Sequence, residues 1–110
     1  MHLLTKPIRA ELLRRGKLDN VMDLPPVVKF FTPDGACTWL IASMDDDGDT
    51  LFGLCDLGLG FPELGTVSLS ELKTVRGLLG LPVERDTHIT FDESLRVYVE
   101  KANAARHISA

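Results

Sequence analysis

Long apolar segments are missing from this sequence of 110 residues, and their absence excludes whole classes of protein. The uninterrupted apolar runs, such as Trp39 to Ala42, are far shorter than the roughly 20 residues that a transmembrane helix needs. The N-terminal stretch MHLLTKPIRAELLRR also lacks the apolar core and the small-residue cleavage site of a signal peptide. We therefore expect a cytoplasmic protein that does not associate with a membrane.

Cysteine is scarce as well, since the chain contains only Cys37 and Cys55. Two cysteines are too few for a disulfide scaffold, and no Cys-x-x-Cys motif is present for a redox or zinc site. Both cysteines sit inside apolar runs, which is typical of small buried side chains. The sequence predicts no metal site and no cofactor.

An excess of positive charge is also lacking, because the formal net charge is -4. An acidic protein is not drawn to nucleic acid as a whole, although a local basic patch could still contact it. Nucleic-acid binding is therefore an alternative that the overall charge does not favour. Its candidate residues are the basic side chains of the first segment, namely Lys6, Arg9, Arg14, Arg15 and Lys17.

What is present is an ordinary folded composition, 45% hydrophobic and 25% charged, over a length that suits a single domain of residues 1–110. The segment TKPIRAELLRRGK is predicted to be a helix, since Thr5 can cap it, Pro7 lies in its first turn and Gly16 ends it. Enrichment in β-branched and aromatic residues then predicts strands in VVKFFT, ACTWLIASM, TLFGLCDL and TVSL. Short turns between these strands favour an antiparallel meander.

After the meander the period of the apolar residues changes. SLSELKTVRGLLG is predicted to be a helix with a capping box formed by Ser68 and Glu71. LPVERDTHITF is predicted to be a last strand, and DESLRVYVEKANAARH a helix capped by Asp92. The predicted fold class is α+β: an antiparallel β-meander sheet of four to five strands with an N-terminal helix, a helix after the meander and a C-terminal helix.

The stretch SMDDDGDTLFGL, residues 43–54, places four aspartates and a glycine between two apolar runs. If Gly48 held the sixth position of a calcium loop, Leu54 would hold the twelfth, where an acidic ligand is required. The stretch is therefore interpreted as a hairpin tip, with Asp47 and Gly48 as a two-residue turn that places Leu40 opposite Cys55.

Strand alternation around that turn predicts a sheet with two largely apolar faces. Such a sheet is either covered on both sides or uses one face for dimerisation. The two cysteines are expected on opposite faces, where they cannot form a disulfide. One face would carry Trp39, Ile41, Phe52 and Leu54 together with Cys37, and the other Leu40, Ala42, Met44, Leu51 and Cys55.

The segment ERDTH is the first candidate site, because it groups acids, a base and an imidazole within five residues. A general acid/base pair could be drawn from Glu84, Arg85, Asp86 and His88. The alternative is a solvated strand with cross-strand ion pairs. No serine, cysteine or second histidine near this segment completes a familiar catalytic set, which favours the alternative.

The segment GLGFPELG is the second candidate site. Glu63 stands where a dinucleotide-binding loop needs its third glycine, and the Gly-Lys-Ser/Thr of a Walker loop is absent. The segment is therefore interpreted as a mobile contact loop that presents Phe61 and Glu63.

An ordered set of short motifs resembles a known bacterial family, the domain of unknown function 2958. The motifs are KFFTPDG (29–35), Trp39, LFGL (51–54), PELGTVSLSEL (62–72) and RGLLGLPVERD (76–86), and the resemblance spans roughly residues 3 to 90. The resemblance implies a small bacterial protein whose relatives are often carried near plasmid or other mobile-element genes. It brings no activity, ligand or catalytic residue with it.

Three functions are consistent with these observations. The first is a non-enzymatic binding or interaction module with a protein partner or with itself, such as an accessory protein of a mobile genetic element. The second is a small hydrolase-like enzyme that uses Glu63, Glu84, Asp86 and His88. The third is a nucleic-acid-associated accessory protein that uses the basic first helix. The lack of a catalytic set favours the first.

Overall fold

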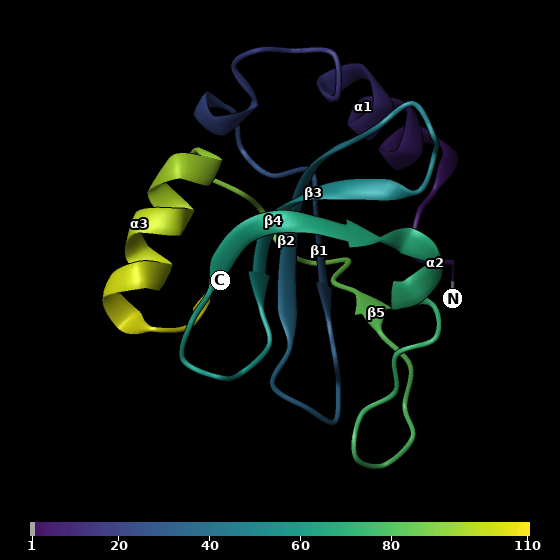
Figure 1. Cartoon of the computed structure of the whole chain (residues 1–110), viewed down its shortest axis with the longest axis vertical. Coiled ribbons are helices and arrows are strands. Elements are labelled where there is room, and N and C mark those ends of the chain that lie inside the picture. The colour runs from purple at the N-terminus through teal and green to yellow at the C-terminus, as the bar shows by residue number, and fades with distance from the viewer. Residues whose placement is uncertain (1) are drawn as a thin grey trace.

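The fold is a five-stranded antiparallel sheet with helices on both of its faces. The computed structural model describes residues 2–110. The strands lie in the order β4-β3-β2-β1-β5, and every pair of neighbours is antiparallel (Figure 1). This arrangement confirms the predicted meander and the α+β class. The strands are β1 (Val28–Phe31), β2 (Thr38–Met44), β3 (Thr50–Asp56), β4 (Glu63–Ser68) and β5 (Glu84–Arg85).

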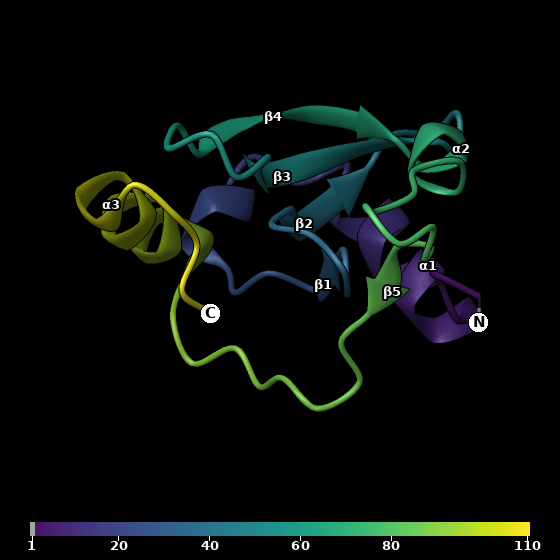
Figure 2. The ribbon, with the colours of Figure 1, turned by 90° about the horizontal axis from the view of Figure 1, so that it is seen from below.

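Within residues 2–110, three α-helices and one short 3-10 helix cover the sheet, namely α1 (Lys6–Arg15), α2 (Leu69–Leu72), α3 (Leu95–Ala105) and η1 (Val21–Asp23). Figure 2 shows α1 and α2 on one side of the sheet and α3 with η1 on the other. Leu12 and Leu72 pack with Trp39 in the first core, whereas Leu95 packs with Leu40 in the second. Both apolar faces are therefore covered by the chain itself, which was the first of the two predicted possibilities.

The helix α1 forms where its capping residues predict it. The Thr5 hydroxyl accepts a hydrogen bond from the Ile8 amide at 3.3 Å, and Pro7 lies in the first turn. The helix ends at Gly16, where a Cβ atom would lie 2.1 Å from the carbonyl oxygen of Met44. The end of α1 thus packs directly on the backbone of β2.

The β2–β3 hairpin contains a bulge that the sequence did not predict. Met44 pairs with Leu51, but Leu40 pairs with Leu54 rather than with Cys55, because the register shifts by one residue between Ile41 and Ser43. The extra residue of β2 bends the strand and changes the direction of the side chains that follow it.

This bulge makes the prediction of the two faces wrong for half of the hairpin. Trp39 and Ile41 share a core with Met44 and Leu51, whereas Leu40, Ala42 and Leu54 occupy the other core with Phe52 packed against it. Cys37 and Cys55 both pack against the first core instead of lying on opposite faces, and both thiols are free.

Two predicted elements are much shorter than their sequence patterns suggest. The helix after the meander stops after Leu72, and the chain then forms a loop closed by the bridge between Arg76 and Pro82. The last strand contains only Glu84–Arg85. It ends there because the Asp86 carboxylate accepts hydrogen bonds from the amides of His88 and Ile89, which turns the chain away from the sheet.

The cap of α3 also differs from the prediction, although the helix itself is confirmed. The Ser94 hydroxyl accepts from the Val97 amide, while Asp92 accepts from the Tyr98 hydroxyl. Among residues 2–110 the structure contains no helix with the length and apolarity that crossing a membrane requires.

The bulge requires a glycine on the neighbouring strand, which gives a first testable prediction. A Cβ atom on Gly53 would lie 2.0 Å from the carbonyl oxygen of Leu40, whereas a Cβ on the paired Gly65 would meet nothing within 4 Å. We expect Gly53→Ala to lower the free energy of unfolding by about 1–3 kcal/mol, as overpacking usually does. Gly65→Ala should change it by less than about 0.5 kcal/mol. Urea unfolding followed by circular dichroism measures both, and equal midpoints for the two variants would contradict the prediction.

Candidate functional site

The sheet places the acidic residues of the two candidate segments at opposite edges. Glu63 begins β4, whereas Glu84 and Arg85 form β5, and three strands lie between β4 and β5. Phe61 and Glu63 line a groove of about 370 Å³ with Asn103 and Arg106 of the α3 end. The carboxylates of Glu63, Glu84 and Asp86 therefore do not meet in one concavity.

The groups of the ERDTH segment make contacts within the chain. The Arg85 guanidinium donates to the carbonyl oxygens of His2 and Leu3 at 2.7 and 3.0 Å and ties down the N-terminal segment. The Asp86 carboxylate lies 3.6 Å from the Lys29 ammonium. The pKa of Asp86 is lowered, chiefly by the hydrogen bond from the His88 amide. The hydrogen bond from the Ile89 amide and the charge of Lys29 lower it further, and partial desolvation opposes them.

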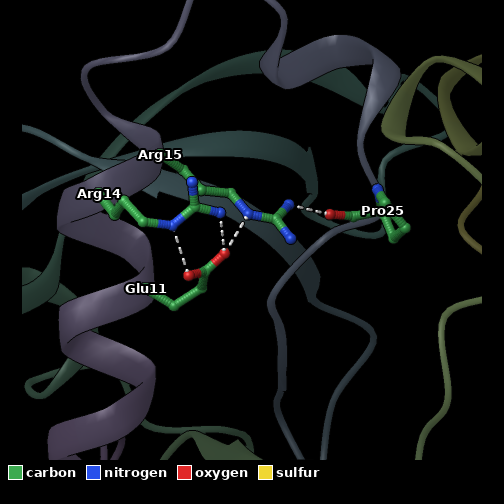
Figure 3. A network of polar contacts seen from close by, with 4 residues as sticks. All are labelled: Glu11, Arg14, Arg15 and Pro25. Carbon is green, nitrogen blue, oxygen red and sulfur yellow. Dashed lines mark hydrogen bonds and ion pairs between the residues drawn. The ribbon is translucent and has the colours of Figure 1, made fainter.

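The basic face of α1 is largely occupied by its own neighbours. Glu11 accepts hydrogen bonds from Arg14 at 2.7 and 2.8 Å and from Arg15 at 2.8 Å, and Arg15 also donates to the Pro25 carbonyl (Figure 3). The hydrogen bonds from Arg14 and then Arg15 lower the pKa of Glu11 to about 2. Arg9 donates to the Gly48 carbonyl at 3.2 Å. Three of the five basic side chains that are candidates for nucleic-acid contacts therefore already bond to groups of the same chain.

The aspartate cluster closes the hairpin and caps a helix. The loop is wider than the predicted two-residue turn, since the Asp45 amide bonds to the Thr50 carbonyl across residues 46–49. Asp47 accepts from the amides of Asp49 and Thr50 and from the Thr50 hydroxyl. Within residues 2–110 no group of three or more histidine, cysteine, aspartate or glutamate side chains is arranged to hold a metal ion.

Asp49 links this hairpin tip to the start of α2. Its carboxylate accepts from the hydroxyls of Ser68 and Ser70 and from the Ser70 amide. These bonds lower its pKa, and the bonds from Thr50 and Asp49 likewise lower the pKa of Asp47. The Ser68 hydroxyl in turn accepts from the Glu71 amide, as the capping box predicts.

Burial determines the pKa of the Cys55 thiol. Desolvation raises its pKa to about 11. A thiol that stays protonated at neutral pH is a poor nucleophile and a poor metal ligand. Cys55 is therefore a packing residue of the first core.

One end of the sheet gathers large apolar side chains on its surface, and we call it the apolar end. The loop between β3 and β4 and the loop after α2 both lie there, on either side of the β1–β2 turn (Figure 1). Leu78 is 94% exposed, Leu79 82% and Leu59 73%. Apolar side chains this exposed contribute nothing to the core. The full set is Leu57, Leu59, Phe61, Leu78, Leu79 and Leu81.

Asp34, in the β1–β2 turn, holds the loop after α2 in place. Its Oδ2 atom accepts from the amide of Leu79 at 2.7 Å and from that of Leu81 at 3.2 Å. A Cβ atom on Gly77 would lie 1.6 Å from Asp34 Oδ1, so the loop comes this close only because residue 77 is glycine. The leucines at its tip are therefore presented by a fixed backbone.

Asp56 holds the loop between β3 and β4 in a similar way. Its side chain accepts from the Gly58 amide at 2.8 Å and from the Ile108 amide at 2.8 Å, which joins the C-terminal segment to this loop. The Cys37 thiol also donates to the Leu57 carbonyl at 3.7 Å. The three loops thus form one connected surface.

Phe61 is the only residue of this surface that is a candidate from the sequence. Leu79 belongs to the segment SLSELKTVRGLLG, which is predicted to be a helix, but the chain there is a loop and the side chain is exposed. The available signal was the composition of LGLGF and GLLGL, in which glycines interrupt apolar residues that a regular element would have buried.

Removal of the Asp34 carboxylate should release the loop after α2. We expect Asp34→Ala to speed hydrogen exchange at the Leu79 and Leu81 amides at least tenfold, since a hydrogen bond to a charged acceptor is worth about 1.5–3 kcal/mol. Asp46→Ala is the matched control, because Asp46 is an exposed aspartate in the separate loop between β2 and β3. Unchanged exchange in Asp34→Ala, measured by NMR, would show that the carboxylate does not hold the loop.

The hairpin tip should lose stability in acid. Because hydrogen bonding lowers the pKa of Asp47 and Asp49 in the folded state, their contribution is complete above the unfolded value of about 3.9 and is lost as the pH falls through the lower folded values. NMR titration of the carboxyl carbons should place both midpoints below 3.8, the ordinary aspartate value. Midpoints at or above that value would rule out these bonds in solution.

Comparison with known proteins agrees with the resemblance seen in the motifs. No curated protein and no solved structure matches the chain. One family model matches residues 3–109, nearly the whole chain, and therefore extends past residue 90, where the resemblance predicted from the motifs ends. The chain belongs to the family described as "Protein of unknown function (DUF2958)".

Proposed function

We propose that this protein is a non-enzymatic interaction module that inserts its apolar end into an apolar groove on a partner protein. The observation that carries the proposal is the exposure of six large apolar side chains on connected loops at one end of the sheet. Groups of large exposed apolar side chains mark contact surfaces on soluble proteins.

The shape and stiffness of this end favour a protein groove as its target. Leu78 and Leu79 stand at the tip of a loop and project from the surface rather than lining a cavity. Asp34 and Asp56 fix the backbones of the two loops, so little conformational freedom is lost on binding. Projecting apolar side chains on a rigid backbone are suited to fill a pocket at the centre of an interface.

The charge of the molecule favours a protein over an anionic membrane or nucleic acid. The net charge of -4 repels both of those surfaces. Glu63 adds a carboxylate close to Phe61, and Lys73 and Arg76 lie near the other loop. A polar rim of mixed sign around apolar residues is the ordinary composition of a protein interface. An accessory protein of a mobile genetic element, as the family resemblance implies, would act in this way.

The two other functions have less support in the geometry. A hydrolase built from the predicted acidic and histidine residues would need Glu63 beside Asp86, and β4 and β5 lie at opposite edges of the sheet. A nucleic-acid surface on α1 would need free basic side chains, but Arg14 and Arg15 are bonded to Glu11.

Site-specific crosslinking tests the proposal. We expect a photoreactive benzoylphenylalanine at position 78 to form adducts with one partner protein in the native host, and the same group at position 100 on α3 to form none with it. Leu78→Ser/Leu79→Ser should then weaken binding of that purified partner at least 100-fold, since each leucine loses about 1.5–3 kcal/mol of burial. Isothermal titration calorimetry measures the affinity.

Glu100→Ser on the exposed face of α3 is the matched control and should leave the affinity unchanged. The leucines contribute nothing to the core, so the double variant should keep the wild-type unfolding midpoint. Unchanged affinity in the double variant would refute the proposal. Leucine-dependent binding to phosphatidylcholine vesicles would also refute it, because the target would then be a lipid surface.

A further inference from the structure

The outer edge of β4 is the longest unpaired strand edge among the described residues. The strand ends the sheet on one side and is six residues long, whereas β5 at the other edge has two. Figure 2 shows β4 at the margin of the sheet with no element beyond it. Such an edge presents backbone amides and carbonyls that another strand can pair with.

This edge lacks the features that normally prevent such pairing. The strand ELGTVS contains no lysine and no proline, and its register with β3 is continuous over all six residues. Its one charged residue, Glu63, stands at its end. Leu64 is 39% exposed, and the space around Gly65 is open.

We propose that this edge pairs with β4 of a second copy of the chain, antiparallel and about a two-fold axis, to make one continuous sheet across the dimer. An axis that relates two antiparallel strands side by side stands perpendicular to the sheet, so each face of the sheet stays on its own side. A residue can then pair only with a residue of the same face. The axis must therefore pass through a pair formed by the same residue of the two copies, and not between two successive residues of the strand.

Two residues could lie at the axis, and the structure favours Gly65 over Thr66. An axis at Thr66 would pair Leu64 with the partner's Ser68, whose hydroxyl already bonds to Asp49 and Glu71 at the start of α2. It would also set Glu63 against the partner's Leu69, which is helical. An axis at Gly65 keeps all five pairs within residues 63–67, with Pro62 just outside the ladder, where its missing amide costs nothing.

The pairs of this register are chemically compatible. Leu64 lies opposite the partner's Thr66, and Glu63 lies opposite the partner's Val67. The two Glu63 residues are four positions apart along the strands, or about 13 Å, so their charges do not confront each other. The strand is thus complementary to itself, which is why a second copy is the occupant and not an unrelated peptide.

The dimer does not depend on the proposed function. The paired edge excludes the leucines of the loop after α2, so either proposal can fail alone. Because the strands run antiparallel, the two apolar ends of the dimer would point in opposite directions and would remain free to bind two partners.

Charge substitutions at positions 64 and 66 test both the dimer and its register. Leu64→Lys/Thr66→Lys would place like charges directly opposite each other in two cross-strand pairs and should give a monomer in sedimentation equilibrium. Leu64→Lys/Thr66→Glu puts opposite charges in the same pairs and should restore the dimer. The wild type should sediment at twice the chain mass of 12.1 kDa, and Leu78→Ser/Leu79→Ser should do so as well.

Disulfide trapping tests the axis position directly. In a Cys37→Ala/Cys55→Ala background, Gly65→Cys should form an intermolecular disulfide under mild oxidation, because paired Cα atoms across an antiparallel ladder lie about 4.5–5.5 Å apart. Thr66→Cys should not, since its Cα atoms would be about 8 Å apart. A wild-type monomer at millimolar concentration would overturn the proposal, even if β4 then bound a peptide. Disulfide formation at position 66 in preference to 65 would overturn the register.

Discussion

The close contact of β2 with its neighbours is the constraint on which the rest of the structure depends. The one-residue bulge turns Met44 toward the core of α1, where it pairs with Leu51, while Leu40 and Ala42 stay on the side of α3. Gly53 admits the bulge from β3, and Gly16 lets the end of α1 rest on the Met44 carbonyl. Alternation divides the apolar residues of β2 between two cores, and the bulge moves Met44 to the core that Trp39 and Ile41 occupy.

Much of this fold could be predicted from the sequence, because its signals are local. Thr5 and Ser68 cap helices by bonding amides three residues away, and the strand segments were marked by β-branched and aromatic residues. The bulge could not be predicted, since it depends on the contact between Gly53 and the Leu40 carbonyl across two strands. A shift of one residue moves every following side chain to the other face, so the face prediction failed there.

The site was harder to predict than the fold because exposure is a tertiary property. The spacing of Leu72, Val75 and Leu79 fits a helical stripe, but the chain leaves the helix at Lys73, and the Asp34 carboxylate holds the loop that follows. That carboxylate comes from a turn 45 residues before Leu79, and nothing near Leu79 in the sequence indicates it. By contrast, Phe61 could be predicted because the proline and glycines around it already indicate a loop.

The same physical rule explains the acidic residues in both places. A carboxylate that accepts hydrogen bonds from two backbone amides fixes a loop without adding to the core, and Asp34, Asp47, Asp56 and Asp86 each do so. The carboxylates that first suggested a metal or a catalytic site are used in this way to stiffen loops. Because these carboxylates fix the backbones of the loops, the loop tips stay rigid while their leucines stay exposed. That division suits a surface for binding better than a pocket for chemistry.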